Sequence, residues 1–173
     1  MKNEQIPISS PDWNVANPSA SFRAFAEAIH EKAKYVFIRD KNHSEMLFFM
    51  PLNGQGHIIQ SRYKDRDEMA EWMKKHIKDH YIYGLVHICE SWLRMAEKKN
   101  DNTLRQVIDG EIRVSELREE DRKEALAVAA QARDGWSMTW IDEIVRAKDT
   151  GKLSLKPLLK LQDFDGRFGK LFG

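Results

Sequence analysis

The chain has 173 residues, a formal net charge of +1 and one cysteine, and 42% of its residues are hydrophobic. This length predicts one domain with a real core, and the balanced charge argues against bulk electrostatic binding to nucleic acid or anionic membrane. A single thiol excludes an internal disulfide framework. No apolar run approaches the ~18–20 residues of a spanning helix.

We expect a cytoplasmic protein, because one thiol fits a reducing compartment and the first residues contain no apolar signal region. A membrane partner is not expected. Nucleic acid is an unlikely partner at this net charge, although Arg167 and Lys170 beside Phe168 suggest basic and aromatic contacts to a nucleic-acid strand.

Residues 1–18 are expected to form a flexible lead-in. Pro7, Pro11 and Pro18 lie among Asn and Ser residues without hydrophobic periodicity. Trp13 is the exception, because a lone indole can anchor such a segment to the body of a domain.

Two helices are predicted. The first covers Ser21–Ala33, where apolar residues recur at three- and four-residue intervals, and residues 35–38 either continue it or begin a strand. The second covers Asp67–Lys78, with Asp65 or Asp67 as its cap.

Three strands are predicted before the middle of the chain. Glu45–Met50 and His57–Arg62 form a hairpin around the glycines of Asn53-Gly54-Gln55-Gly56. Ile82–Trp92 is apolar on both alternating faces, as in a central strand covered on both sides.

The segment before Asp134-Gly135 gives conflicting signals. Residues 119–132 have high helix propensity, yet an Asp-Gly pair between two apolar segments is a strong hairpin signal. We predict strands over Glu124–Arg133 and Ser137–Arg146, because tertiary context often overrides propensity.

These elements predict an α+β fold, with an antiparallel β-sheet of about five strands and two helices packed on it. The domain covers residues 19–160. An aromatic and glycine-rich tail, residues 161–173, contains Phe164, Phe168 and Phe172.

Motifs for common enzyme classes are absent from the sequence: there is no phosphate loop, GxGxxG, GxSxG, HExxH or CxxC. His87 and Cys89 share a strand face, but two ligands are too few for a typical zinc site, so core packing is the favoured interpretation. We therefore expect no metal and no cofactor.

Glu90 is the most unusual residue, because it shares its predicted face with Val86, Ile88 and Trp92. An unpaired carboxylate there is costly. We predict a buried pair with Arg122 or Arg146. The alternatives are a cleft carboxylate that acts as ligand or base, and an exposed position at the strand end.

An acidic cluster interleaved with basic residues lies just before the predicted strand at residue 124. Its oxygens could bind a divalent cation, but a solvated turn is favoured because the basic residues can neutralise the acids locally. The acidic members are Glu116, Glu119, Glu120, Asp121 and Glu124.

The segments CESWLRM and SELREEDRKEAL, with the strand pair ending in Ile144 and Arg146, resemble a set of uncharacterised bacterial and phage-associated proteins. Their signature resembles (S/A)EAW, then P-S-(E/D)-x-P-(D)-R-x-E, then I-x-R. Val114 and Glu120 replace the two prolines. The resemblance implies an α+β fold with an antiparallel sheet and implies no activity. The matching residues are Glu90, Trp92, Asp121, Arg122, Glu124, Ile144 and Arg146.

Two functions follow as expectations. The first is a small accessory or interaction protein without catalysis of its own, whose aromatic tail binds a protein partner or a second copy, unless the tail packs back onto its own domain. The second is a small-ligand-binding protein or enzyme with an anion site. The residues of that expected site are Glu90, Trp92, Arg122 and Arg146.

Overall fold

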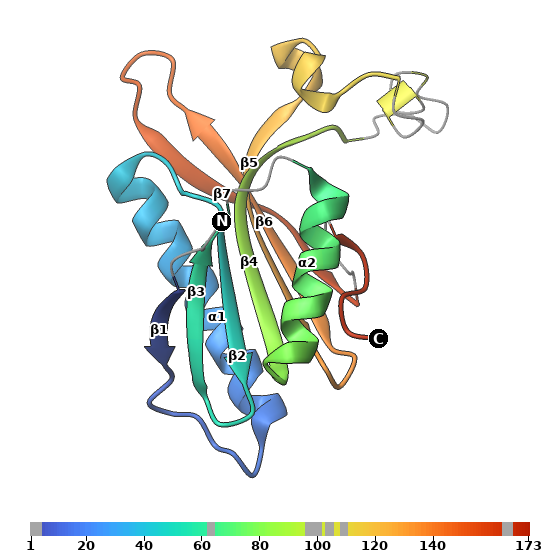
Figure 1. The fold of residues 1–173 in the computed structure, drawn as a ribbon. Helices are drawn as coiled ribbons and strands as arrows, with labels where there is room; N and C mark the ends of the chain where they lie inside the picture. The colour runs from blue at the N-terminus through green and yellow to red at the C-terminus, as the bar shows by residue number, and fades with distance from the viewer. Residues whose placement is uncertain (1–4, 62–64, 96–101, 103–105, 108–110, 164–167) are drawn as a thin grey trace.

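An antiparallel sheet of seven strands runs through the computed structural model, with helix α1 (Pro18–Asp40) on one face and helix α2 (Arg66–Asp79) on the other (Figure 1). The structure describes residues 5–61, 65–95, 102, 106–107, 111–163 and 168–173. In order across the sheet, the strands are β1 (Gln5–Ser9), β3 (Gln55–Gln60), β2 (Met46–Pro51), β4 (Ile82–Leu93), β5 (Lys123–Ala132), β6 (Ser137–Arg146) and β7 (Leu153–Gln162).

The predicted α+β class, with two helices on an antiparallel sheet, is confirmed. The predicted number of about five strands is wrong, because β1 and β7 were missed. Both lie at the edges of the sheet, and each contains a proline, Pro7 and Pro157. A proline argues against a central strand but is tolerated at an edge, where its missing N–H can face away from the ladder.

The expected flexible lead-in is corrected over residues 5–9, which pair with β3, whereas residues 1–4 lie outside the described part. Trp13 anchors the following turn, since its Nε1 donates to the Leu52 carbonyl at 2.8 Å. A Cβ on Gly54 would lie 2.4 Å from the Trp13 ring, so glycine is required beneath the indole.

The conflict before Asp134-Gly135 is resolved in favour of the hairpin. β5 pairs with β4 and β6 on its two sides, and Gly135 takes the positive φ of +90° that the turn needs. The Asp134 carboxylate accepts the Trp136 N–H at 3.0 Å and so holds the turn. Sheet pairing on both sides therefore outweighs the helix propensity of the alanine-rich segment.

Helix α1 is longer than the predicted Ser21–Ala33 at both ends. The Asn17 side chain accepts the Ala20 N–H, with Pro18 in the first helical position. At the other end residues 35–38 continue the helix, and Lys41 closes it in the left-handed conformation with φ of 62°. The extension carries buried Phe37 onto the sheet.

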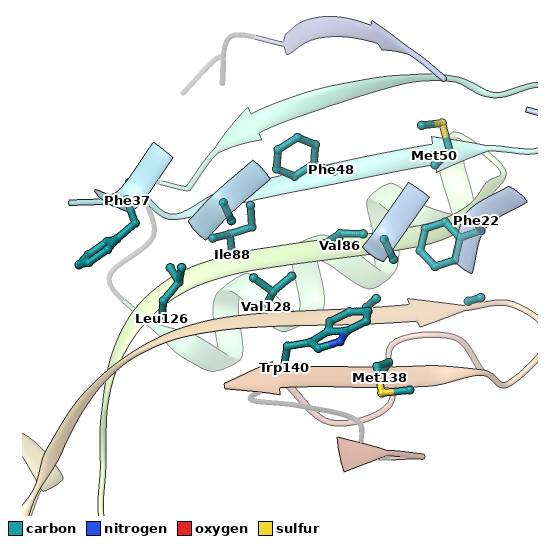
Figure 2. Packing of buried hydrophobic residues seen from close by; sticks show 14 of the residues in the cluster. Phe22, Phe37, Phe48, Met50, Val86, Ile88, Leu126, Val128, Met138 and Trp140 are labelled. Atoms are coloured by element: carbon teal, nitrogen blue, oxygen red, sulfur yellow. The ribbon is translucent and has the colours of Figure 1, made fainter. Parts of the chain in front are cut away.

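The larger core lies between α1 and the sheet, and Figure 2 shows Phe22 and Phe37 of the helix among residues of β4, β5 and β6. Phe22 packs directly over Gly84 of β4, where a Cβ would lie 2.3 Å from its ring. Across from β2, β4 has an additional residue, Tyr83, between the partners of Met50 and Pro51.

The smaller core lies between α2 and the opposite face of the sheet, where Met73 and Ile77 pack with Leu85. Leu171 and Phe172 belong to the same cluster. None of the helices in the described ranges has the length and apolarity that crossing a bilayer requires.

Candidate functional site

A buried histidine and a buried aspartate meet between α1 and the sheet. Nε2 of His30 lies 2.7 Å from Oδ2 of Asp142 on β6. The two residues are only 8% and 3% exposed, in an interface that is otherwise apolar. An ionised carboxylate at this depth is costly without a partner, and His30 supplies one.

The imidazole of His30 also stacks on the indole of Trp140. The ring centroids lie 5.1 Å apart and the planes are inclined by only 14°. Trp140 and Asp142 are two residues apart on β6, so they share the sheet face that α1 covers. The ring of His30 is thereby held by a hydrogen bond at its edge and by stacking on its face.

A cavity of about 230 Å³ opens beside this pair, and its far wall is β7. Ile141 is paired with Leu159 and Asp142 with Pro157, which leaves Leu158 as an extra residue on the edge strand. Such a bulge interrupts the ladder and redirects side chains, and bulges are common beside binding sites. The lining residues are His30, Lys34, Trp140, Asp142, Pro157, Leu158, Leu159 and Lys160.

Lysines supply the positive charge of this cavity. Lys34 pairs with Glu31 at 2.6 Å, and Nζ of Lys160 lies 6.0 Å from the centroid of the Trp140 ring. Glu31 therefore neutralises Lys34, just as the lining carboxylate, Asp142, is already bonded to His30. Lys160 and the Trp140 ring are the cation and the aromatic wall that the cavity offers together.

The four residues predicted as a ligand site lie on the sheet face that α1 covers, nearer the strand ends than the cavity. The Arg122 guanidinium stacks over the Trp92 ring at 4.0 Å from its centroid. Arg146 binds Glu124 through two hydrogen bonds of 2.9 and 3.2 Å. The structure thus brings the residues to one region but pairs them differently from the expectation.

The predicted pair between Glu90 and an arginine is wrong. Glu90 is half-buried and accepts the backbone N–H of His43, while Arg122 donates to the Ser115 carbonyl. Glu124 lies on β5, the strand between β4, which carries Glu90, and β6, which carries Arg146. Arg146 therefore binds Glu124 instead of Glu90. The hydrogen bonds that Arg146 donates to Glu124 are the main cause that raises the pKa of Arg146, and the charge of Glu90 adds a smaller effect.

Searches against protein-family models, curated proteins and solved structures find no match to the chain. The resemblance to bacterial and phage-associated proteins therefore stays a prediction.

Two other candidates from the sequence, the pair His87 and Cys89 and the acidic segment, have neighbours in the fold. His87 Nε2 lies 2.8 Å from Oε1 of Glu45, and Cys89 is buried. In the acidic segment, which contains the 3₁₀ turns η1 (Val114–Glu116) and η2 (Glu119–Asp121), Arg118 pairs with Glu120 and Asp121. These local pairs agree with the favoured interpretation of a solvated turn.

The aromatic tail packs onto its own domain where the structure describes it. Phe172 is 7% exposed, and the Gln131 side chain donates to the Gly169 carbonyl and accepts the Leu171 N–H. Phe168 is half-buried against the same cluster, and Phe164 lies outside the described residues.

Sequence reasoning missed His30 and Asp142, although a signal was available. His30 lies four residues after Ala26 and three before Ala33, within the buried stripe of α1. Asp142 alternates with Trp140 and Ile144 on one face of β6. A polar residue within an apolar stripe is the signal that indicates Glu90, and the same signal applies to His30 and Asp142.

Proposed function

We propose that this protein binds a small anionic ligand in the cavity between α1, β6 and β7. This is the second of the two functions expected from the sequence, placed at a different set of residues. The observation that carries it is the cavity wall formed by the buried pair of His30 and Asp142 together with Lys160, while Lys34 is paired with Glu31.

The chemistry of the wall suits an anion with an apolar part. Nε2 of His30 is bonded to Asp142, and Nδ1 lies 3.6 Å from Oε1 of Glu31, so Lys160 is the group that we expect to meet the charge of the ligand. Trp140 and Leu158 offer apolar contact on the other sides. A few placed polar groups in an apolar wall are the usual composition of a small-molecule site.

The size of the cavity restricts the ligand. The cavity has a volume of about 230 Å³ and opens to solvent. We therefore expect a small carboxylate or phosphate compound.

Calorimetric titration with inorganic phosphate and with small aliphatic and aromatic carboxylates tests this function. Lys160→Ala is the decisive variant, and Lys156→Ala is its matched control, because Lys156 lies on the same strand opposite Glu143 rather than Trp140. We expect one compound to bind at one site per chain, with affinity lowered about tenfold by Lys160→Ala, or ~1.4 kcal/mol. Equal binding by both lysine variants, or no binding by any compound, would contradict the proposal.

The accessory role of the aromatic tail and the cytoplasmic location stay predictions. The packing of Phe172 into its own domain gives the ligand-binding function the better support of the two.

A further inference from the structure

A second cavity lies on the α2 face of the sheet, between the last turns of α2 and the C-terminal segment 168–173 (Figure 1). Its volume is about 490 Å³, and it opens to solvent. Ile77 of α2 and Phe172 of the segment form its apolar wall and are only 5% and 7% exposed. The anion cavity lies against α1 on the opposite face, and the two cavities share no lining residue.

The charged side chains that the described residues contribute to this second cavity are all basic. Lys74 is paired with Glu71 at 2.8 Å, so its charge is balanced. Lys78 forms no ion pair with an acidic group of the described residues, and its neighbour Asp79 is bonded to Lys75 at 2.6 Å. Lys78 therefore offers the cavity a positive charge that no partner holds.

Arg133 is the third basic residue of this wall, and β4 holds it in place. Its backbone N–H donates to the Tyr83 carbonyl at 2.8 Å, and its Nη2 donates to the Ile82 carbonyl at 3.1 Å. No acidic group of the described residues pairs with it. A guanidinium carries five N–H donors in a rigid fork, so most of them remain for a ligand. Arg133 thus presents a positioned positive charge at the cavity wall.

A smaller cavity of about 190 Å³ is also lined by Arg133 and Phe172, so the two cavities meet at these residues. It adds Lys170, which likewise has no ion-pair partner among the described residues. The one acidic side chain among its described lining residues, Asp134, is paired with Arg23 at 3.8 Å. The positive charge around Arg133 therefore exceeds the negative charge on both sides.

We propose that Arg133 and Lys78 bind the phosphate group of a small organic phosphate monoester, whose apolar part lies against Ile77 and Phe172. A phosphate monoester carries a charge of about −1.5 to −2 near pH 7, which matches two unpaired cations. Arginine binds phosphate oxygens through paired N–H donors, and lysine adds a point charge. An apolar wall with a few placed polar groups suits the rest of such a ligand. This site does not rest on the proposed function.

Calorimetric titration with phenyl phosphate at pH 7.5 tests the site, with inorganic phosphate and phenol as the two fragments of the ligand. We expect phenyl phosphate to bind more tightly than either fragment, because it alone meets both the basic and the apolar wall. Lys78→Ala should weaken its binding about fivefold, and Arg133→Met about tenfold. Lys148→Ala, which makes the same charge change in the exposed turn between β6 and β7, should leave binding unchanged.

Lys78→Ala is the decisive variant because Lys78 is exposed and its loss leaves the core intact. Far-UV circular dichroism checks that all variants stay folded. Absence of phenyl phosphate binding by the parent, or equal affinity in the Lys78→Ala and Lys148→Ala variants, overturns the proposal.

The Lys160→Ala variant separates this site from the anion cavity. Phenyl phosphate bound beside Arg133 should keep its affinity in Lys160→Ala. Binding that is weakened by Lys160→Ala and not by Lys78→Ala would place the ligand in the anion cavity, which overturns this inference and supports the proposed function.

Discussion

Two buried histidines, His30 on the α1 face of the sheet and His76 on the α2 face, have partners of opposite kinds. On the α1 face His30 meets the carboxylate of Asp142 at 2.7 Å, and on the α2 face His76 meets the imidazole of His57 at the same distance. On the α2 face burial lowers the pKa of His76, and the charges of His80 and His57 lower it further. The same residue type therefore has a carboxylate partner on one face and an imidazole partner on the other.

The largest expected effect comes from making the same substitution on both faces. His30→Phe keeps a ring against Trp140 but leaves Asp142, which is 3% exposed, without its bonded histidine. We expect a loss of ~3–5 kcal/mol in the free energy of unfolding. His76→Phe keeps the ring beside Trp72 and strands no charge, so its loss should stay below about 1 kcal/mol.

Urea denaturation at pH 7.5 measures both variants beside the parent. The double variant His30→Phe with Asp142→Leu should recover most of the loss, because an apolar pair of similar volume replaces the hydrogen-bonded polar pair. Equal losses in the two single variants would mean that Asp142 does not depend on His30.

The second effect is a loss of stability in acid that originates on the α2 face. The pKa of His76 is about 4 in the folded chain and 6.5 is its ordinary value. Between these values the unfolded chain binds the proton and the folded chain does not, so stability is complete above about pH 6.5 and falls toward pH 4. With screening by solvent at this partly exposed cluster, we expect His76 to account for about 1–2 kcal/mol.

Urea denaturation of the parent and of His76→Phe at pH 7.5 and pH 5 measures this contribution. Other groups titrate in both proteins, so the difference between the two acid losses belongs to His76. If His76→Phe loses as much stability in acid as the parent, His76 is not the cause of the loss.

The contrast also explains how far the sequence could predict the molecule. The five inner strands follow from alternation and from Asp134-Gly135, because each must be apolar on the faces it buries. The edge strands β1 and β7 bury fewer side chains, and their prolines weaken the strand pattern in the sequence. The sequence shows which residues are polar within an apolar stripe, but not their partners.

Partner choice depends on register and on packing between elements. The sequence predicts an arginine partner for Glu90. In the structure Arg146 donates to Glu124 on the intervening strand, and the backbone N–H of His43 donates to Glu90. The two histidine sites join residues 112 and 19 positions apart in the sequence. No local spacing predicts such contacts, which arise only after helix and sheet have packed.

The smallest expected effect concerns the exposed residue His80 at the end of α2. Because His80 is exposed, His80→Gln should change the free energy of unfolding at pH 7.5 by no more than ~0.5 kcal/mol. The charge of His80 lowers the pKa of His76, so its removal should bring that pKa closer to the unfolded value. The acid loss between pH 7.5 and pH 5 should then be a few tenths of a kcal/mol smaller than in the parent. Urea denaturation of the parent and of the variant at both pH values measures this difference. A variant with a larger acid loss than the parent would show that His80 supports the neutral state of His76 by contact, and not by charge.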